Sequence, residues 1–353
     1  MRAFVTAVAL AALFMTACQP VETHNSEKRG GALHVNISDI PHIVFPGQVE
    51  KRSEQILVCQ VYSGLVKYNP KTLEIVPSVA KSHNISPDGL TYTFVLNSRA
   101  KFQDDRCFLQ GKGRHITAAD FKYSLEQVCR NRLAHDRGIP HQMRNIEGAE
   151  AFLPTAKDND SVNISGITAP NDSVLVIKLK KPDDLFLHFL AGTNALVFAR
   201  EAFNAYGVNG TAGSGPFRMK YPNIIGQQIV LSRIADYWET SDDNVQLPYL
   251  DSVVFSFITS PKKEIYLFEI GKANVVFDVA AAQITPFLES NIEKFESDPP
   301  VYIMTNTLNQ DNDKRFNMLT ANVKDLFINS QNYFDFTKVY LQEPEPSTVT
   351  GTN

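Results

Sequence analysis

The chain has 353 residues, which allows two or three domains at about 100–200 residues each. Hydrophobic residues make up 43% and charged residues 20%, as in a globular protein that buries a core. The formal net charge is −4, and basic residues form only short clusters such as Lys112–Arg114. Nucleic-acid binding needs a clustered positive face, so nucleic acid is not expected as a partner.

The N-terminus has the form of an export signal. Ala3–Phe14 is almost wholly apolar and too short to span a bilayer core of about 30 Å. It leads into Met15-Thr16-Ala17-Cys18, which resembles a bacterial lipobox, in which the cysteine is acylated. The alternative is an ordinary secretory peptide followed by a coincidental cysteine. We expect a lipoprotein signal peptide at 1–17, lipidation at Cys18 and a polar tether at 18–32.

Export would place the other three cysteines in an oxidising compartment, where at most one pair of them can form a disulfide. Cys107 and Cys129 are the expected pair, which would pin a loop to the helix that follows it. Cys59 lies in an apolar run and is expected to be buried. A zinc site is the competing interpretation, but no CxxC or HxxxH spacing accompanies these residues.

Taken in chain order, the patterns predict mixed α and β structure. Residues 90–96 alternate after an Asp-Gly turn, as a strand does. Thr117 and Asp120 form a capping box that opens a helix. Pro261 stands at the first position of another helix, which Gly271 ends. Further strands are expected at 32–37, 174–179, 228–233 and 252–257, and a further helix at 50–62.

The sequence contains no catalytic constellation. HExxH and G-x-S-x-G are missing, and Gly111-Lys112-Gly113 lacks the hydroxyl residue of a P-loop. The Gly213-Ser214-Gly215 run lacks the third glycine of a dinucleotide fingerprint. His135 and His141 do not share a helix face. We expect no enzyme activity, no metal and no cofactor.

Short sequence motifs between Gly30 and Val279 occur in the same order as the motifs of one family. The most specific is Gly213–Phe217, where that family has Gly-Thr-Gly-Pro and an aromatic residue. On these residues the chain resembles the periplasmic oligopeptide- and dipeptide-binding proteins of ABC importers, the family 5 extracellular solute-binding proteins. The other phrases are Gly30–Leu33, Val61–Val66, Thr72–Ala80, Ile85–Leu96, Lys101–Leu125, Ile146–Ala149, Ser165–Ile167, Lys180–Pro182, Asp236–Trp238, Leu247–Asp251 and Gly271.

The resemblance implies an α/β periplasmic binding protein-like fold of the class II type, with two lobes that close on a ligand. Extended peptides are held there through backbone hydrogen bonds. It also implies a domain division. A first lobe is expected from 33–52 with 166–280 (domain I), a domain inserted in it from 53–165 (domain II), and the beginning of a second lobe with a disordered tail from 281–353.

By position, Ser38, Asp39 and Ile40 are expected to line the ligand site, with the turn at Gly213, Ser214 and Gly215 close by. Asp39 is interpreted either as a partner for a ligand amine or as an exposed loop acid.

The chain departs from the family after the first lobe, because the second lobe barely starts and the returning C-terminal segment is largely missing. We expect a lipid-anchored, non-catalytic extracytoplasmic receptor, which delivers peptides or similar small solutes to the permease subunits of an ABC transporter. The alternative is a membrane-tethered interaction protein, or a truncated remnant of such a receptor, without solute binding.

Overall fold

A computed structural model describes residues 29–42, 44–69, 72–129, 139–151, 163–210, 212–219, 228–277, 286–287, 289, 301–306, 316–321, 323–324 and 335–341. The expected signal peptide, Cys18, most of the tether and the tail at 342–353 lie outside these ranges. Within them, no helix is long and apolar enough to cross a membrane.

The larger sheet has seven strands in the order β12-β13-β11-β1-β10-β9-β8. At its centre β1 pairs in parallel with both β10 and β11, and the remaining pairs are antiparallel. Leu33 and Val35 of β1 are buried on either side of the exposed His34, and Asn36 at the end of the strand is buried as well. The strands are β1 (Ala32–Asn36), β8 (Phe217–Met219), β9 (Gln228–Arg233), β10 (Ser252–Ser256), β11 (Val275–Phe277), β12 (Val301–Asn306) and β13 (Phe316–Ala321).

The smaller sheet has four antiparallel strands in the order β4-β5-β7-β6. Tyr92, Phe94 and Leu96 of β5 are buried and alternate with half-buried residues, so one face of the strand enters the core. Helix α3 (Ala118–Cys129) packs against β6 and β7. The strands are β4 (Ala80–Ile85), β5 (Thr91–Leu96), β6 (Ile167–Asn171) and β7 (Val174–Lys178).

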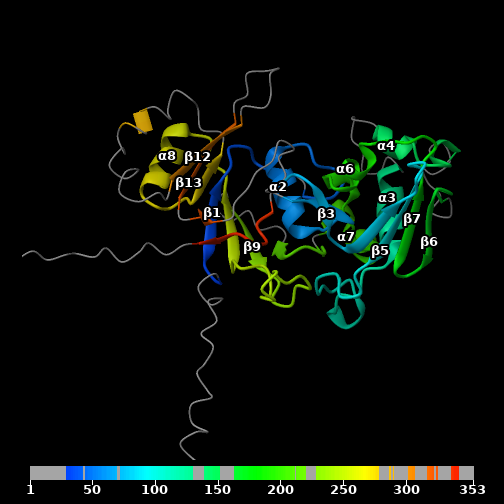
Figure 1. Ribbon diagram of the computed structural model, residues 1–353. Coiled ribbons are helices and arrows are strands. Elements are labelled where there is room, and N and C mark those ends of the chain that lie inside the picture. The colour runs from blue at the N-terminus through cyan, green and yellow to red at the C-terminus, as the bar shows by residue number, and fades with distance from the viewer. Residues whose placement is uncertain are drawn as a thin grey trace, which may run out of the picture.

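Helices α2 (Arg52–Val61) and α8 (Pro261–Glu269) lie on opposite sides of the larger sheet (Figure 1). One hydrophobic cluster includes buried residues of both sheets and of α2, from Leu33 to Val339. The smaller elements are two pairs, β2 (Val66–Tyr68) with β3 (Ile75–Pro77) and β14 (Val323–Lys324) with β15 (Tyr340–Leu341), the helices α4 (His141–Arg144), α6 (Phe186–Leu190) and α7 (Arg200–Tyr206), and the 3₁₀ turns η1 (Leu109–Gly111), η2 (Thr193–Ala195) and η3 (Gly207–Asn209).

The sequence predicted these elements closely. The expected strands at 32–37, 90–96, 174–179, 228–233 and 252–257 are β1, β5, β7, β9 and β10, each within a residue or so of the expected bounds. One half of the expected capping box is present, because Asp120 Oδ2 accepts a hydrogen bond from Thr117 N at 2.8 Å. Thr117 Oγ1 donates to the same oxygen at 2.9 Å, and Asp120 N donates to Thr117 O.

Strand pairing bears on the expected domain division. Strands β6 and β7 join β5, so residues 167–178 belong to the smaller sheet together with part of the 53–165 segment. A boundary between 165 and 166 therefore cuts off two strands of that sheet. The domain division itself stays a prediction.

The expected disulfide between Cys107 and Cys129 is wrong for this structure, in which the two cysteines are not bonded. The loop of Cys107 lies at the start of α3, where Arg114 pairs with Asp120 at 2.6 Å. Cys129 is the last residue of α3, about 15 Å further along at 1.5 Å per residue. A disulfide needs Cα atoms within about 7 Å. Burial and the neighbouring Asp105 also raise the pKa of Cys107 to about 12, which disfavours the reactive thiolate.

A short C-terminal segment, 335–341, lies against the first lobe. Phe336 and Val339 are fully buried in the main hydrophobic cluster. Phe336 N donates a hydrogen bond to Gln60 Oε1 of α2 at 3.1 Å, and Tyr249 N donates to Thr337 O at 3.3 Å. This segment thus packs on α2 and on the residues just before β10.

Candidate functional site

The candidate site is the edge of the larger sheet where the parallel strands β1 and β10 end. We call this the carboxyl edge and define it as residues 36–42 and 256–260. In open α/β sheets, ligands bind outside the carboxyl ends of parallel strands, where the connections diverge to opposite faces. Here β1 is followed by α2 and β10 is followed by α8, on opposite sides of the sheet (Figure 1).

A buried polar network holds the two strand ends together. Asn36 is 1% exposed, and its Nδ2 donates to Glu264 Oε1 at 2.5 Å and to Ile258 O at 3.2 Å. Its Oδ1 accepts a hydrogen bond from Ile258 N at 3.1 Å. Because Glu264 is in the first turn of α8, this network fixes the end of β1 to the start of that helix.

Two carboxylates cap the start of α2. Asp39 Oδ2 accepts hydrogen bonds from Ser53 N at 3.1 Å and Ser53 Oγ at 2.8 Å. Glu54, which is 2% exposed, accepts from His42 N at 2.8 Å through Oε1, and from Glu50 N and Lys51 N through Oε2. These contacts satisfy main-chain N–H groups at the helix start and complement its positive dipole. An anionic ligand group would have to displace them.

The loop after β1 presents the residues expected to meet a ligand. Ser38 and Asp39 are half-buried, and Ile40 is 41% exposed. Lys51 Nζ donates to Ile40 O at 2.7 Å and lies 3.0 Å from His42 Nε2, which holds the loop against α2. The side chain of Ile40 and the hydroxyl of Ser38 are thus on a fixed loop at the carboxyl edge.

The turn at Gly213, Ser214 and Gly215 lies at the other end of α2. A Cβ at Gly213 would stand 1.9 Å from Val61 O, so this backbone approach excludes any larger residue. Gly215 N donates to Val61 O at 2.8 Å. Ser214 is 1% exposed, and its Oγ accepts from Ser63 N at 2.9 Å. The turn therefore joins β8 to the end of α2.

The structure does not bring the two expected groups of ligand residues together. Asp39 caps the start of α2, and Gly213 packs on its last residue, Val61. Ten helical residues at 1.5 Å each separate these ends by about 15 Å. The geometry therefore does not support a single ligand site that includes both residues 38–40 and the turn at Gly213–Gly215. Ser38, Asp39 and Ile40 remain the candidate ligand residues.

Sequence reasoning missed Asn36, Glu54 and Glu264. The spacing of Glu54 three residues after Lys51 was a readable signal, because an acid at this position caps a helix start. Nothing local to Asn36 indicates a partner 228 residues away. Among the described residues, no group of three or more histidine, cysteine, aspartate or glutamate side chains is arranged to hold a metal ion.

Comparison with known proteins agrees with this architecture. The fold resembles that of the Haemophilus influenzae OppA in complex with RPPGFSPFR (TM-score 0.64, 19% identity), which covers 78% of this chain and 50% of that one. The Helicobacter pylori periplasmic binding protein DppA in complex with the peptide STSA gives a TM-score of 0.60 at 21% identity, over 79% of this chain and 51% of that one. The fold is thus that of the periplasmic binding proteins.

The sequence then identifies the family. Residues 74–326 match the model of the bacterial extracellular solute-binding proteins, family 5 Middle, and the chain belongs to this family. It is 25% identical to the glutathione-binding protein GsiB of Escherichia coli K12, over 67% of this chain and 40% of that protein. It is 26% identical to the dipeptide-binding protein of Escherichia coli K12, over 56% of this chain and 35% of that protein. The chain thus aligns with less than half of these relatives.

Proposed function

We propose that this protein is a lipid-anchored extracytoplasmic receptor that binds short peptides or similar small solutes at the carboxyl edge. It would pass them to the permease subunits of an ABC transporter and would not change them chemically. The observation that carries the proposal is the arrangement of β1 between β10 and β11, with the edge fixed by Asn36 and Glu264. Family membership and the peptide-binding relatives support the ligand class.

The chemistry of the edge favours recognition through main-chain groups and apolar contact. The N–H groups at the start of α2 already bind Asp39 and Glu54, so they do not offer an anion site. Lys51 already binds Ile40 O and Asn36 already binds the main chain of Ile258, but Ile40 offers an exposed apolar side chain. An extended peptide satisfies such a surface by backbone hydrogen bonds, with tolerance for its side chains.

Thermal unfolding tests this site. The chain from Gln19 onward is mixed with di- to hexapeptide pools, and the midpoint of unfolding is recorded. A ligand that binds only the folded state, present at 100 times its dissociation constant, adds about 2.7 kcal/mol and raises the midpoint. We expect at least one pool to do so.

A pair of variants locates the binding. Ile40→Glu places a charge at the carboxyl edge, and Leu109→Glu makes the same change at a side chain that is 87% exposed in η1. We expect the peptide-induced shift to be lost in Ile40→Glu and kept in Leu109→Glu. If every pool leaves the midpoint of the unaltered chain unmoved, solute binding is wrong and a tethered interaction protein becomes the better function. An equal shift in both variants would move the site away from Ile40.

Lipid attachment is tested separately. Bacteria that express the full chain are fed an alkyne fatty acid, and labelling is read on the purified protein. We expect label on the unaltered chain and on a Cys59→Ala control, but not on Cys18→Ala. Label that persists in Cys18→Ala would refute the lipid anchor and leave the solute-binding proposal standing.

A further inference from the structure

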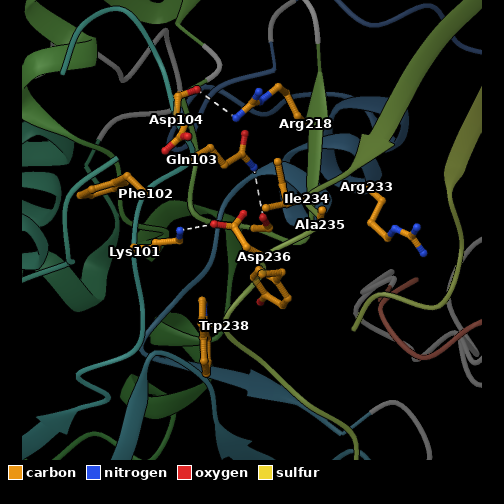
Figure 2. Close-up of a pocket in the computed structure, with 12 residues that line it drawn as sticks. Lys101, Phe102, Gln103, Asp104, Arg218, Arg233, Ile234, Ala235, Asp236 and Trp238 are labelled. Carbon is orange, nitrogen blue, oxygen red and sulfur yellow. Dashed lines mark hydrogen bonds and ion pairs between the residues drawn. The ribbon is translucent and has the colours of Figure 1, made fainter. Parts of the chain in front are cut away.

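A cavity of about 180 Å³ lies far from the carboxyl edge. It is lined by residues 101–104, by Gly215 and Arg218, and by the segment 233–238, which begins at the last residue of β9 (Figure 2). Arg233 N donates to Asp251 O at 2.9 Å, and Asp251 directly precedes β10. The cavity therefore lies near the amino-terminal end of β10, about 16 Å along the five-residue strand from its carboxyl end.

The space exceeds what one bridging water needs. A single water needs about 10–15 Å³ on the same measure, so the cavity has room for a small ligand. Phe102, Ile234 and Trp238 form apolar parts of the wall, and the rest of the lining includes the charged side chains of Lys101, Asp104, Arg218, Arg233 and Asp236. This combination of a small volume, apolar surface and a few polar groups is typical of a small-ligand site.

Gln103 presents a buried acceptor with a fixed orientation. It is 4% exposed, and its Nε2 donates to Gly215 O at 3.1 Å and Phe217 O at 2.8 Å. Because both partners are carbonyl oxygens, the nitrogen must face them, and the opposite orientation of the amide is excluded. The Oε1 atom is buried and has no hydrogen-bond partner in the described part of the chain. In Figure 2 this oxygen points to the side on which Arg218 lies.

Arg218 supplies a cation beside this acceptor. Its guanidinium donates to Asp104 O at 2.9 Å, and among the described residues it forms no ion pair with a carboxylate. The other charges around the cavity are matched, because Lys101 pairs with Asp236 and Arg233 pairs with Asp251 at 2.9 Å. Asp104 pairs with Lys112 at 2.7 Å, so within the described ranges Arg218 is the lining cation that has no carboxylate partner.

Trp238 adds a further unsatisfied group. Its indole Nε1–H is buried and has no acceptor in the described structure. Buried polar groups are normally hydrogen-bonded, so a donor and an acceptor without partners at one cavity are unusual.

We propose that this cavity is a second binding site, for a ligand that carries an α-carboxylate next to an α-nitrogen bearing hydrogen. The carboxylate binds the Arg218 guanidinium, which matches carboxylate geometry. The neighbouring N–H donates to Gln103 Oε1. This chemistry occurs in a free amino acid and in the C-terminal residue of a short peptide. The site is separate from the carboxyl edge and does not depend on peptide binding there.

The fluorescence of Trp238 reads this site directly, because it is the single tryptophan of the chain. We would titrate the purified protein with L-alanine, with N-acetyl-L-alanine and with L-alaninamide. Alanine stands for the free amino acid and N-acetylalanine for a peptide C-terminus, whereas alaninamide lacks the carboxylate. We expect a saturable emission change with at least one of the two acids and none with alaninamide.

The matched variants are Arg218→Met and Arg144→Met. Arg144 Nε also donates to one main-chain carbonyl, Ile139 O at 3.3 Å, but Arg144 is exposed and does not line the cavity. Because Arg218→Met removes a charge-assisted hydrogen bond, it should lower the affinity for the carboxylic-acid ligand by about tenfold or more. Arg144→Met should bind like the unaltered chain, and so should Ile40→Glu, which affects only the carboxyl edge.

Several results would overturn the proposal. They are no saturable change with either acid, an equal change with alaninamide, or undiminished binding in a folded Arg218→Met. If Arg218→Met fails to fold, the contrast between the acids and alaninamide on the unaltered chain decides alone. The acid that saturates at the lower concentration identifies the source of the ligand. A peptide-induced rise in unfolding midpoint with no change in Trp238 emission would keep the carboxyl edge and reject the cavity.

Discussion

Phe336→Ala tests whether the segment 335–341 is part of the core of the first lobe. Phe336 is fully buried, and its ring lies 6.1 Å from that of Phe255, centroid to centroid. Its main-chain N–H donates to Gln60 Oε1 at 3.1 Å. Removal of a buried phenylalanine side chain costs about 3–5 kcal/mol, from lost transfer free energy and from the cavity left behind. That is a large share of the 5–15 kcal/mol that is typical of a whole domain.

The loss has an upper limit set by the segment itself. If alanine weakens the segment enough for it to detach, Val339 leaves the core as well, and the ion pair between Lys67 and Asp335 at 3.3 Å is broken. Further loss then stops, because the remaining lobe no longer depends on position 336. The free energy of unfolding should therefore fall by about 3–5 kcal/mol or by the docking free energy of the segment, whichever is smaller.

Urea unfolding followed by far-UV circular dichroism measures this change. Tyr266→Ala is the control, because Tyr266 is 57% exposed on α8 and surface substitutions change stability by about 0.5 kcal/mol or less. A loss below about 1 kcal/mol in Phe336→Ala, similar to that in the control, would show that 335–341 is not docked in the core.

Two further predictions concern the turn at β8 and the same C-terminal segment. Gly213→Ala should destabilise the chain by about 3 kcal/mol or more, because its Cβ would stand 1.9 Å from Val61 O. In the control Gly111→Ala the new Cβ meets no atom within 4 Å, so the substitution should cost only about 1–2 kcal/mol for its positive φ. Equal shifts of the thermal unfolding midpoint in the two variants would contradict the steric argument. Burial raises the pKa of Asp335, but the attraction of Lys67 and hydrogen bonds to the carboxylate outweigh it and lower the pKa below its ordinary value of 3.8. The stability contributed by this carboxylate is thus present above pH 3.8 and is lost as the pH falls through the folded-state pKa. The difference in free energy of unfolding between the unaltered chain and Asp335→Asn should therefore narrow in that acid range. A difference that does not change with pH would refute the pairing of Asp335 with Lys67.

The elements were predictable because their causes are local. The alternation of 90–96, the capping box at Thr117 and Asp120, and the proline at position 261 all act within a few residues. Hydrophobic period reports which face of a strand or helix is buried, and caps report where a helix starts. Neither depends on the partner that covers the face.

The candidate site could be predicted only in part. The sequence located the loop at 38–40 after the first strand, which the structure places at the carboxyl edge. It gave no sign that Asp39 caps α2 or that Asn36 meets Glu264 from a distant helix. The disulfide predicted at Cys107 was wrong for the same reason, because spacing along the chain does not show which residues lie close in space.

The sequence by itself determined the secondary structure, the absence of a catalytic motif and membership of a solute-binding family. Only the tertiary structure decided which residues share a site. It separated the loop at 38–40 from the turn at 213–215 by the length of α2, and it joined Gln103 and Arg218 around one cavity. The physical reason is that local pattern sets the conformation of a segment, whereas a site is made by close approach of segments far apart in the chain, which depends on how whole elements pack.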